Sequence, residues 1–271
     1  MNNKISTGRL ILLLASTLLV IGCGLKKSGS EETNQQQKEL DPIIQRLINN
    51  MVSIEGGTFL MGGRNHLEVE SSKMSQHRVT LSPFLIGRYE VTQAEWVAVM
   101  GNNPAKHKGD MLPISNISYK QIMVFIEKLN EMTGMQFRLP TDAEWEYAAR
   151  GGQLSKGYTY SGSNNVHDVA WCGSDANYEA QIVGTKQPNE LGLYDMSGNV
   201  DEICSDYFSM HTSTADEVDP KGPENGYNVA YGNNHVTRGG AYMNENSCRI
   251  ALRTGLDEDS HDTLFGFRLA L

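Results

Sequence analysis

The feature that most constrains the fold is the uneven distribution of helical signals along the chain. These signals lie at residues 43–48 and between residues 92 and 151, whereas the segments 161–178 and 211–235 are rich in Asn, Gly, Asp and Ser. Such turn-forming residues leave few long periodic segments in the second half of the chain. The sequence also has no internal repeat, which argues against a solenoid or a propeller. The order of elements predicts an α+β fold instead of alternating βαβ units.

Three helix starts carry a capping-box pattern, in which Ser or Thr is followed three residues later by Glu or Gln. The pairs are Thr92 with Glu95, Ser118 with Gln121, and Thr141 with Glu144. The helix after Ser118 is the clearest, because apolar residues recur at helical spacing from Ile122 to Met132 and Gly134 follows them. A short strand is predicted upstream, at Thr58–Met61, because glycine pairs bound it on both sides.

Residues 1–22 are predicted to be a cleaved signal peptide and not part of the fold. Lys4 and Arg9 precede an apolar and small-residue run of about a dozen residues, which is too short for a spanning helix. The run ends in the letters VIGC at Cys23, which resembles a bacterial lipobox. The resemblance implies cleavage before Cys23 and a lipid on its sulfur. The alternative is a plain signal peptide followed by an incidental cysteine.

Residues 23–42 are polar and almost without large apolar side chains, so they are predicted to be a lipidated cysteine and a disordered tether. A tether suits a lipid-anchored protein, and the two interpretations support each other. They predict an exported protein, anchored by lipid to a membrane of the bacterial cell envelope, with its globular domain at 43–271. Which membrane and which leaflet hold the anchor stays open. A net charge of −9 disfavours nucleic acid as a partner.

Three cysteines fall within the predicted domain, namely Cys172, Cys204 and Cys248. An odd number leaves at least one thiol unpaired, and the sequence does not decide whether any two of them form a disulfide. Three cysteines do not make a disulfide-dense scaffold, so the stability of the domain must come from a sizeable apolar core.

Four groups of segments, in this order, resemble the formylglycine-generating enzyme (sulfatase-modifying factor) domain family. They are MVSIEGGTFLMGG; YEVTQAEWVAVMG with PISNISYKQIMVFIEKLN; FRLPTDAEWEYAARGG with PNELGLYDMSGNVDEICSD; and VTRGGAYMNENSCRIALR with FGFRLAL. The resemblance runs from about Met51 to Leu271. It implies a single loop-rich domain of mixed α and β structure, related to the C-type lectin fold.

The family includes copper-dependent oxidases that convert a sulfatase cysteine to formylglycine, iron-dependent sulfoxide synthases, and members that only bind ligands or partners. Cu(I) prefers thiolate ligands, and the oxidases carry two cysteines a few residues after Arg-Gly-Gly. The first of these positions falls here at Met243 or Asn244, and neither side chain is a thiolate. The sequence therefore assigns no catalytic residue and does not support copper. Cys248 is interpreted as a small core residue, with a redox or metal role as the alternative.

A calcium site is implied by the resemblance in the stretch YDMSGNVDEICSD. The ligands would be the side chains of Asp195 and Glu202 and the backbone carbonyls of Gly198 and Val200. Calcium binds six to eight oxygens, so a glycine turn beside two carboxylates is chemically reasonable. A solvated acidic turn is the alternative interpretation. The sequence departs from the family here, because Asp201 stands where the family usually has an aromatic residue.

The last segment, residues 238–265, is predicted to line the family's substrate groove. Its arginines, together with Arg268, could bind an anion, although ion pairs with Asp and Glu are the commoner role of such clusters. The acidic stretch Leu256–Asp262 would border the groove, either as a solvated loop or as a contact for a polar partner. If the segment is diversified for ligand capture, the variable positions would fall at 242–246 and 254–263.

Three hypotheses follow from the sequence. The favoured one is an envelope lipoprotein whose domain binds a ligand or a protein without catalysis. The second is a metal-dependent oxidase that generates formylglycine with an altered site, and the third is a structural component of an envelope complex. The identity of the ligand or partner and the oligomeric state stay open.

Overall fold

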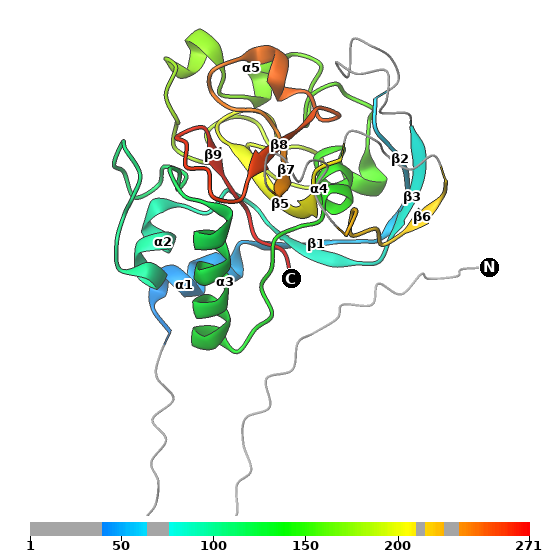
Figure 1. The fold of residues 1–271 in the computed structure, drawn as a ribbon. Coiled ribbons are helices and arrows are strands. Elements are labelled where there is room, and N and C mark those ends of the chain that lie inside the picture. Colours follow the sequence, from blue (N-terminus) through cyan, green and yellow to red (C-terminus); the bar gives the residue numbers. More distant parts are fainter. Residues whose placement is uncertain (1–39, 64–75, 210–214, 225–232) are drawn as a thin grey trace, which may run out of the picture. The chain divides into compact units, whose positions relative to one another are not determined.

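The helices begin where the sequence carries its capping residues. The computed structural model describes residues 40–63, 76–209, 215–224 and 233–271 (Figure 1). The helices are α1 Pro42–Asn49, α2 Gln93–Met100, α3 Tyr119–Thr133, α4 Asp142–Ala149 and α5 Val166–Val169. The three predicted capping boxes are confirmed at the starts of α2, α3 and α4. The predicted signal peptide, Cys23 and nearly all of the predicted tether lie outside the described residues.

Nine short strands form three separate sheets within the described residues. They are β1 Met51–Ile54, β2 Gly57–Met61, β3 His77–Leu81, β4 Phe84–Gly87, β5 Asp201–Tyr207, β6 Glu217–Val218, β7 Asn234–Arg238, β8 Arg253–Asp257 and β9 Phe265–Gly266. β1 pairs with β4, the second sheet has the order β2-β3-β6, and the third has the order β8-β7-β5-β9. Single 3-10 turns, η1 Gly152–Leu154, η2 Gly173–Ala176 and η3 Glu245–Cys248, interrupt the loops of the second half. The α+β organisation is thus confirmed, while a relation to the C-type lectin fold stays a prediction.

The residues after β9 connect distant parts of the domain through backbone hydrogen bonds. The Gly87 N–H at the end of β4 donates to the Leu269 carbonyl at 2.8 Å. The Ala270 N–H donates to the Arg138 carbonyl, also at 2.8 Å, in the segment that leads into α4. The end of the described chain therefore joins the first sheet to α4, and it fixes the two against each other.

The first core lies among α1, α2 and α3. Trp96 of α2 stacks on Phe125 of α3 with ring centroids 5.2 Å apart, and both rings meet Phe267 edge-on. The buried residues of α3 are Ile122, Phe125, Ile126 and Leu129. The sequence extended this apolar face to Met132, which was wrong: its side chain is 43% exposed. Met132 lies in the last turn of α3, past the residues that reach the core.

α4 is buried on every side. It packs against β2, β3, β5 and β7, and all eight of its residues are buried. Three of them are acidic, namely Asp142, Glu144 and Glu146, so this helix brings carboxylates into the centre of the domain. No helix in the described part of the chain is long and apolar enough to cross a membrane.

Candidate functional site

A tight turn after β7 directs the C-terminal segment. Gly239 and Gly240 both have positive φ, at 94° and 70°. A Cβ atom on Gly240 would lie 2.4 Å from the backbone of Ser247, so the chain approaches itself more closely there than any side chain would allow. Asp201 of β5 accepts a hydrogen bond from the Gly240 N–H and another from the Thr237 hydroxyl. Asp201 thus holds the turn in place, and this explains its departure from the family's aromatic residue.

The two positions that correspond to the oxidases' first cysteine are occupied by non-thiolate side chains at the surface. Met243 is 48% exposed. Asn244 caps η3, because its side-chain oxygen accepts a hydrogen bond from the Asn246 N–H at 2.9 Å. The cap is a structural role, since it satisfies a backbone donor at the start of the turn. Neither residue supplies a soft, anionic ligand for Cu(I).

Cys248 is fully buried at the end of η3, which confirms its interpretation as a core residue. No local pattern in the sequence predicts that Cys172 lies beside it, yet the two cysteines share one small apolar cluster with Val166 and Ala170. The interaction between the two thiols lowers the pKa of Cys172, and the same interaction, together with burial, raises the pKa of Cys248. Two sulfurs are therefore adjacent here, and both are fully buried. A copper ion that reacts with a substrate would instead have to be accessible from the surface.

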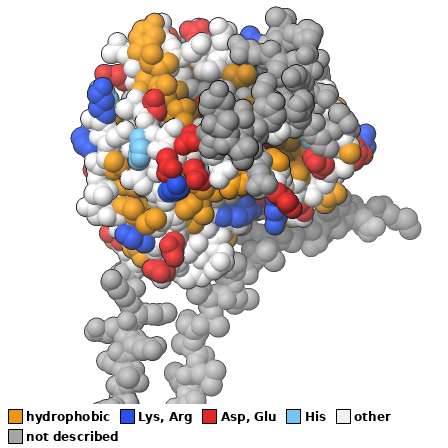
Figure 2. All heavy atoms as spheres, viewed as in Figure 1, with side chains coloured by type: hydrophobic (Ala, Val, Ile, Leu, Met, Phe, Trp, Pro, Cys, Tyr) orange, Lys and Arg blue, Asp and Glu red, His pale blue; other side chains and the backbone are white. Residues whose placement is uncertain are grey.

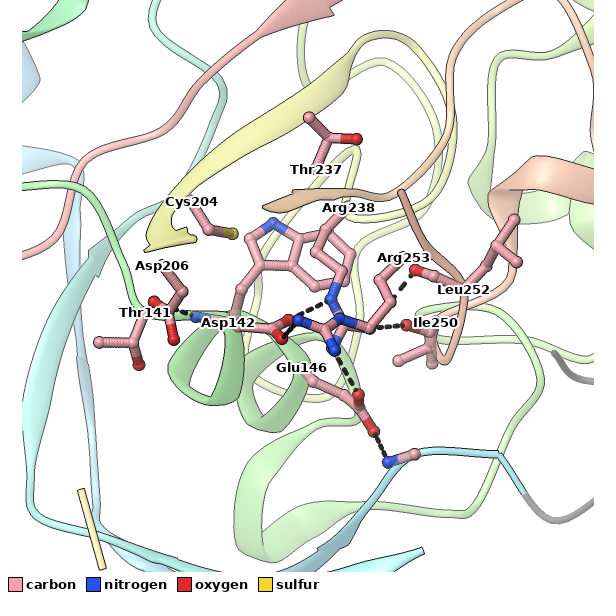
Figure 3. A network of polar contacts seen from close by, with 12 residues as sticks. Thr141, Asp142, Glu146, Cys204, Asp206, Thr237, Arg238, Ile250, Leu252 and Arg253 are labelled. Carbon is pink, nitrogen blue, oxygen red and sulfur yellow. Dashed lines mark hydrogen bonds and ion pairs between the residues drawn. The ribbon is translucent and has the colours of Figure 1, made fainter. Parts of the chain in front are cut away.

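Most of the arginines of the last segment are committed to ion pairs, and this favours the structural interpretation of the cluster. Arg238 is fully buried and binds Asp142 and Glu146 of α4 (Figure 3). Arg253 of β8 binds the same Asp142 carboxylate at 2.7 Å. Arg150 also binds Glu146. Two carboxylates and three guanidiniums thus make a network that joins α4 to β7 and β8.

Arg268 binds both carboxylate oxygens of Glu202, so it is equally unavailable to an outside anion. Arg249 is the exception among the four predicted arginines. It lines a cavity of about 270 Å³ together with Tyr158 and with Arg150, which is itself ion-paired with Glu146. This cavity and the one described next are lined at their edges by Arg249 and Arg253, but not by Met243 or Asn244.

A cavity of about 340 Å³ opens beside the network. Asp142, Asp206 and Arg253 form one wall, and His77 and Glu217 form part of another. The His77 Nε2 lies 3.2 Å from a Glu217 carboxylate oxygen. Burial raises the pKa of Asp206 to about 7, and the neighbouring Asp142 carboxylate adds to the shift. The walls therefore carry both signs of charge, and one carboxyl group titrates near neutral pH.

The predicted calcium turn contains two buried carboxyl groups, and one of them is already ion-paired with an arginine. Asp195 adopts a positive φ of 56°, and its Oδ2 accepts a hydrogen bond from the Gly184 N–H at 2.6 Å. Its Oδ1 is buried without a hydrogen-bond partner in the part of the chain that the structure describes. Glu202, by contrast, accepts bonds from Arg268 and from the Trp145 indole.

A third carboxylate lies close to this turn. Glu90 accepts hydrogen bonds from the Asn199 amide at 2.6 Å and from the Val200 N–H at 3.0 Å. Burial raises its pKa well above the usual range, and Asp195 and Glu202 add to the shift. Three acidic side chains thus surround one guanidinium. The free Asp195 oxygen could bind a cation, which would favour the ionised form of these carboxyl groups, whereas Glu202 would have to share its oxygens with Arg268. Among the described residues, this turn included, no group of three or more His, Cys, Asp or Glu side chains is arranged to hold a metal ion.

Comparison with known proteins identifies the family to which the chain belongs. Residues 36–271 match the model of the sulfatase-modifying factor enzyme 1-like domain, so the chain belongs to this family. It is 31% identical to the formylglycine-generating enzyme of Thermomonospora curvata, over 83% of this chain and 94% of that protein. It is also 34% identical to the chaperone protein LppX of Paenibacillus barcinonensis, over 70% of this chain and 79% of that protein.

A solved structure extends the likeness to the fold. Treponema denticola variable protein 1 superimposes with a TM-score of 0.73 at 30% identity, and the match covers 81% of this chain and 94% of that one. The structure of PvdO from Pseudomonas aeruginosa superimposes with a TM-score of 0.65 at 24% identity. These relatives carry differently described functions on one domain, so the family alone does not settle what this chain does.

The raised pKa of Asp206 predicts that stability falls as the pH rises. The folded state keeps this proton up to about pH 7, whereas the unfolded chain loses it near the ordinary aspartate pKa of 3.8. Between these two values the native state binds more protons, so raising the pH lowers the free energy of unfolding. Asp206→Asn keeps an oxygen to accept the Asp142 N–H bond, and it should flatten this part of the profile. Urea unfolding at a series of pH values measures the effect.

Asp110→Asn is the matched control, because this aspartate is exposed and its substitution should leave the slope unchanged. Some slope should persist in the Asp206 variant, since burial also raises the pKa of Asp195 and Asp201 to about 6. Identical pH profiles of the wild type and the Asp206 variant would contradict the assignment.

Calcium should raise the melting temperature of the domain, and a chelator should lower it. Saturation at about a hundred times the dissociation constant contributes about 2.7 kcal/mol to a protein that binds only in the native state. Asp195→Asn removes the carboxylate with the free oxygen and should abolish the response, whereas Asp206→Asn should retain it. Differential scanning fluorimetry measures both. If calcium left the melting temperature of the wild-type domain unchanged, Arg268 alone would balance the negative charge of the turn.

Proposed function

We propose that this protein is an exported lipoprotein, anchored through Cys23, whose domain binds a protein partner without oxidase catalysis. The observation that carries the proposal is the surface after the Arg-Gly-Gly turn, where Met243 and Asn244 take the place of a thiolate. The membrane anchor rests on the sequence pattern at Cys23, and the relative named LppX supports a lipoprotein. The name of the same relative, a chaperone protein, supports a protein as the partner.

The surface around the turn is suited to contact. Met243, Asn244 and Asn246 are exposed. The Tyr242 hydroxyl donates to Thr263 at 3.1 Å, so the two stretches expected to vary, 242–246 and 254–263, lie side by side. In the second stretch, Lys120 pairs with Glu258 and Asp259. Lys120 therefore already neutralises part of the negative charge of that loop. This favours a partner that makes polar and apolar contacts over a cationic partner.

An apolar stripe continues the surface. Figure 2 shows hydrophobic side chains gathered at the upper left of this face, over the segment that follows α5 in Figure 1. The exposed large apolar side chains of that segment are Tyr178 and Ile182, at 56% and 51%. Backbone bonds connect it to the turn, because the Tyr178 N–H donates to Gly173 and the Gly173 N–H donates to Tyr242. We call Tyr178, Ile182, Met243, Asn244 and Asn246 the contact surface. Exposed apolar groups of this kind mark protein interaction sites.

Photo-crosslinking in cells tests the contact surface. A photoreactive residue in place of Met243 should give a discrete adduct, because an exposed side chain in an interface lies within reach of the partner. The matched control is Met132 on α3, which is 43% exposed and lies outside the contact surface. Gel shift and mass spectrometry detect the adduct, and Cys23→Ala should move the protein out of the membrane fraction. Equal adducts from both positions, or a Cys23 variant that stays in the membrane, would contradict the proposal.

The second candidate is the oxidase, and the meeting of Cys172 and Cys248 is the observation that favours it. Two adjacent thiols are the ligand set that Cu(I) prefers. Against it, both sulfurs are fully buried in an apolar cluster, and a substrate thiol and dioxygen have no room beside them. We expect no tight Cu(I) binding against a thiol chelator and no formylglycine in a sulfatase-motif peptide. Stoichiometric copper with turnover, both lost in Cys172→Ala, would establish the oxidase instead.

A further inference from the structure

Two segments far apart in sequence bring one cysteine each to the same point. Cys172 precedes η2, and Cys248 ends η3. The backbones beside them are joined, because the Gly173 N–H donates to the Tyr242 carbonyl at 2.7 Å. Asn199 adds a second link: its N–H donates to Trp171, and its carbonyl accepts from the Tyr242 N–H, both at 2.9 Å. The meeting of the two thiols therefore follows from the fold and not from mobile side chains.

The surroundings of this thiol pair are apolar. Both sulfurs are fully buried, and the cluster around them consists of Val166 and Ala170 with Tyr160 at its edge. The Cys248 thiol donates its proton to the Asn244 carbonyl at 3.4 Å. No His, Asp or Glu in the described chain completes a metal-binding group with the pair. The remaining chemistry open to two adjacent thiols is oxidation to a disulfide.

We infer that Cys172 and Cys248 form a disulfide that fastens η3 to η2 in the exported protein. The two thiols lose two protons and two electrons, and one sulfur–sulfur bond forms. The oxidant is a protein disulfide donor of the envelope, whose own disulfide is reduced to a dithiol through a mixed disulfide. The inference rests on the proposed export, because a disulfide persists in an oxidising compartment and not in the cytosol.

The exchange takes place as the exported chain folds, because both sulfurs are buried in the folded domain, out of reach of a protein donor. The thiolate of one cysteine attacks the donor, and the thiolate of the other then displaces the donor from the mixed disulfide.

Cys204 does not compete for either partner. It lies in β5, and its thiol points to the Glu202 carbonyl at 3.9 Å. It belongs to the core around α4 and β5, and not to the cluster of the other two cysteines. Burial raises its pKa well above the usual value, so it is a poor nucleophile. Cys204 is therefore the built-in control: a buried thiol of the same domain that stays reduced.

The disulfide would have two consequences for the contact surface. It would hold the turn that presents Met243 and Asn244 against the segment that presents Tyr178, so the two parts of the surface keep one relative position. It would also consume both sulfurs that the oxidase alternative needs, because a disulfide offers no thiolate to Cu(I). The inference thus deepens the proposed function at the same place in the fold.

The test is differential alkylation of the full-length chain. Cells are quenched in acid, and the membrane fraction is denatured and alkylated before and after reduction. We expect Cys204 to be labelled at once, and Cys172 and Cys248 only after reduction. A cross-linked peptide pair should be lighter than the sum of the reduced peptides by two hydrogen atoms. Cys172→Ala should expose Cys248 to labelling without reductant, whereas Cys204→Ala should leave the pattern of the pair unchanged.

Failure of the inference and failure of the proposed export give different results. Processed chain in the membrane with both thiols labelled before reduction overturns the disulfide and leaves the export standing. Unprocessed chain in the cytosol overturns the export. In that case, refolding of the denatured, reduced protein with oxidised glutathione decides the disulfide separately. Loss of two thiols confirms it, and three labelled thiols in the domain overturn it.

A second measurement tests whether the disulfide restrains η3 or has no effect on its opening. Reduction should speed hydrogen exchange of the backbone amides from 242 to 248 by about tenfold or more, because opening of η3 no longer has to carry η2 with it. Amides of α3 serve as the internal control and should not change. Unchanged exchange in both segments after complete reduction would show that the bond does not hold the surface.

Discussion

The domain depends on a buried guanidinium at the end of β7. Arg238 has no exposed side-chain surface, and it binds Asp142 and Glu146, which α4 presents from the centre of the fold. Removal of Arg238 would leave Asp142 with Arg253, and Glu146 with Arg150, as the remaining ion-pair partner. Breaking a buried pair of this kind costs about 3–5 kcal/mol. The charge of Arg238 therefore fixes α4 to the third sheet, and the glycine turn that follows it starts from a fixed point.

A second guanidinium repeats this arrangement at the end of the chain. Arg268 binds Glu202 of β5 and donates to the Gly87 and Tyr194 carbonyls, so one side chain satisfies groups from three segments. A domain rich in loops has few regular ladders to satisfy its backbone, and buried arginines supply the missing donors. The same residue limits the calcium turn, because it already neutralises one of the carboxylates that a cation would use.

The parts of the fold that the sequence predicted are those that depend on neighbours in the chain. A capping box relates residues three apart, so Ser118 and Thr141 predicted helix starts that the structure confirms. The pairing of Cys172 with Cys248 depends on two irregular segments with no periodicity, and no local signal could reveal it. Asp201 was noticed as a departure from the family, but its bond to the Gly240 turn depends on the pairing of β5 with β7.

The same nonlocal arrangement determines which chemistry the domain can support. A family member with a thiolate after the turn can bind a metal there, whereas this chain exposes Met243 at that place and buries both Cys248 and Cys172. Burial makes a thiol pair inaccessible to substrates, but it also keeps a bond between the two sulfurs out of reach of reductants. The same fold can thus hold either a reactive metal site or a rigid contact surface. Which of the two it holds depends on whether the second sulfur is exposed or buried.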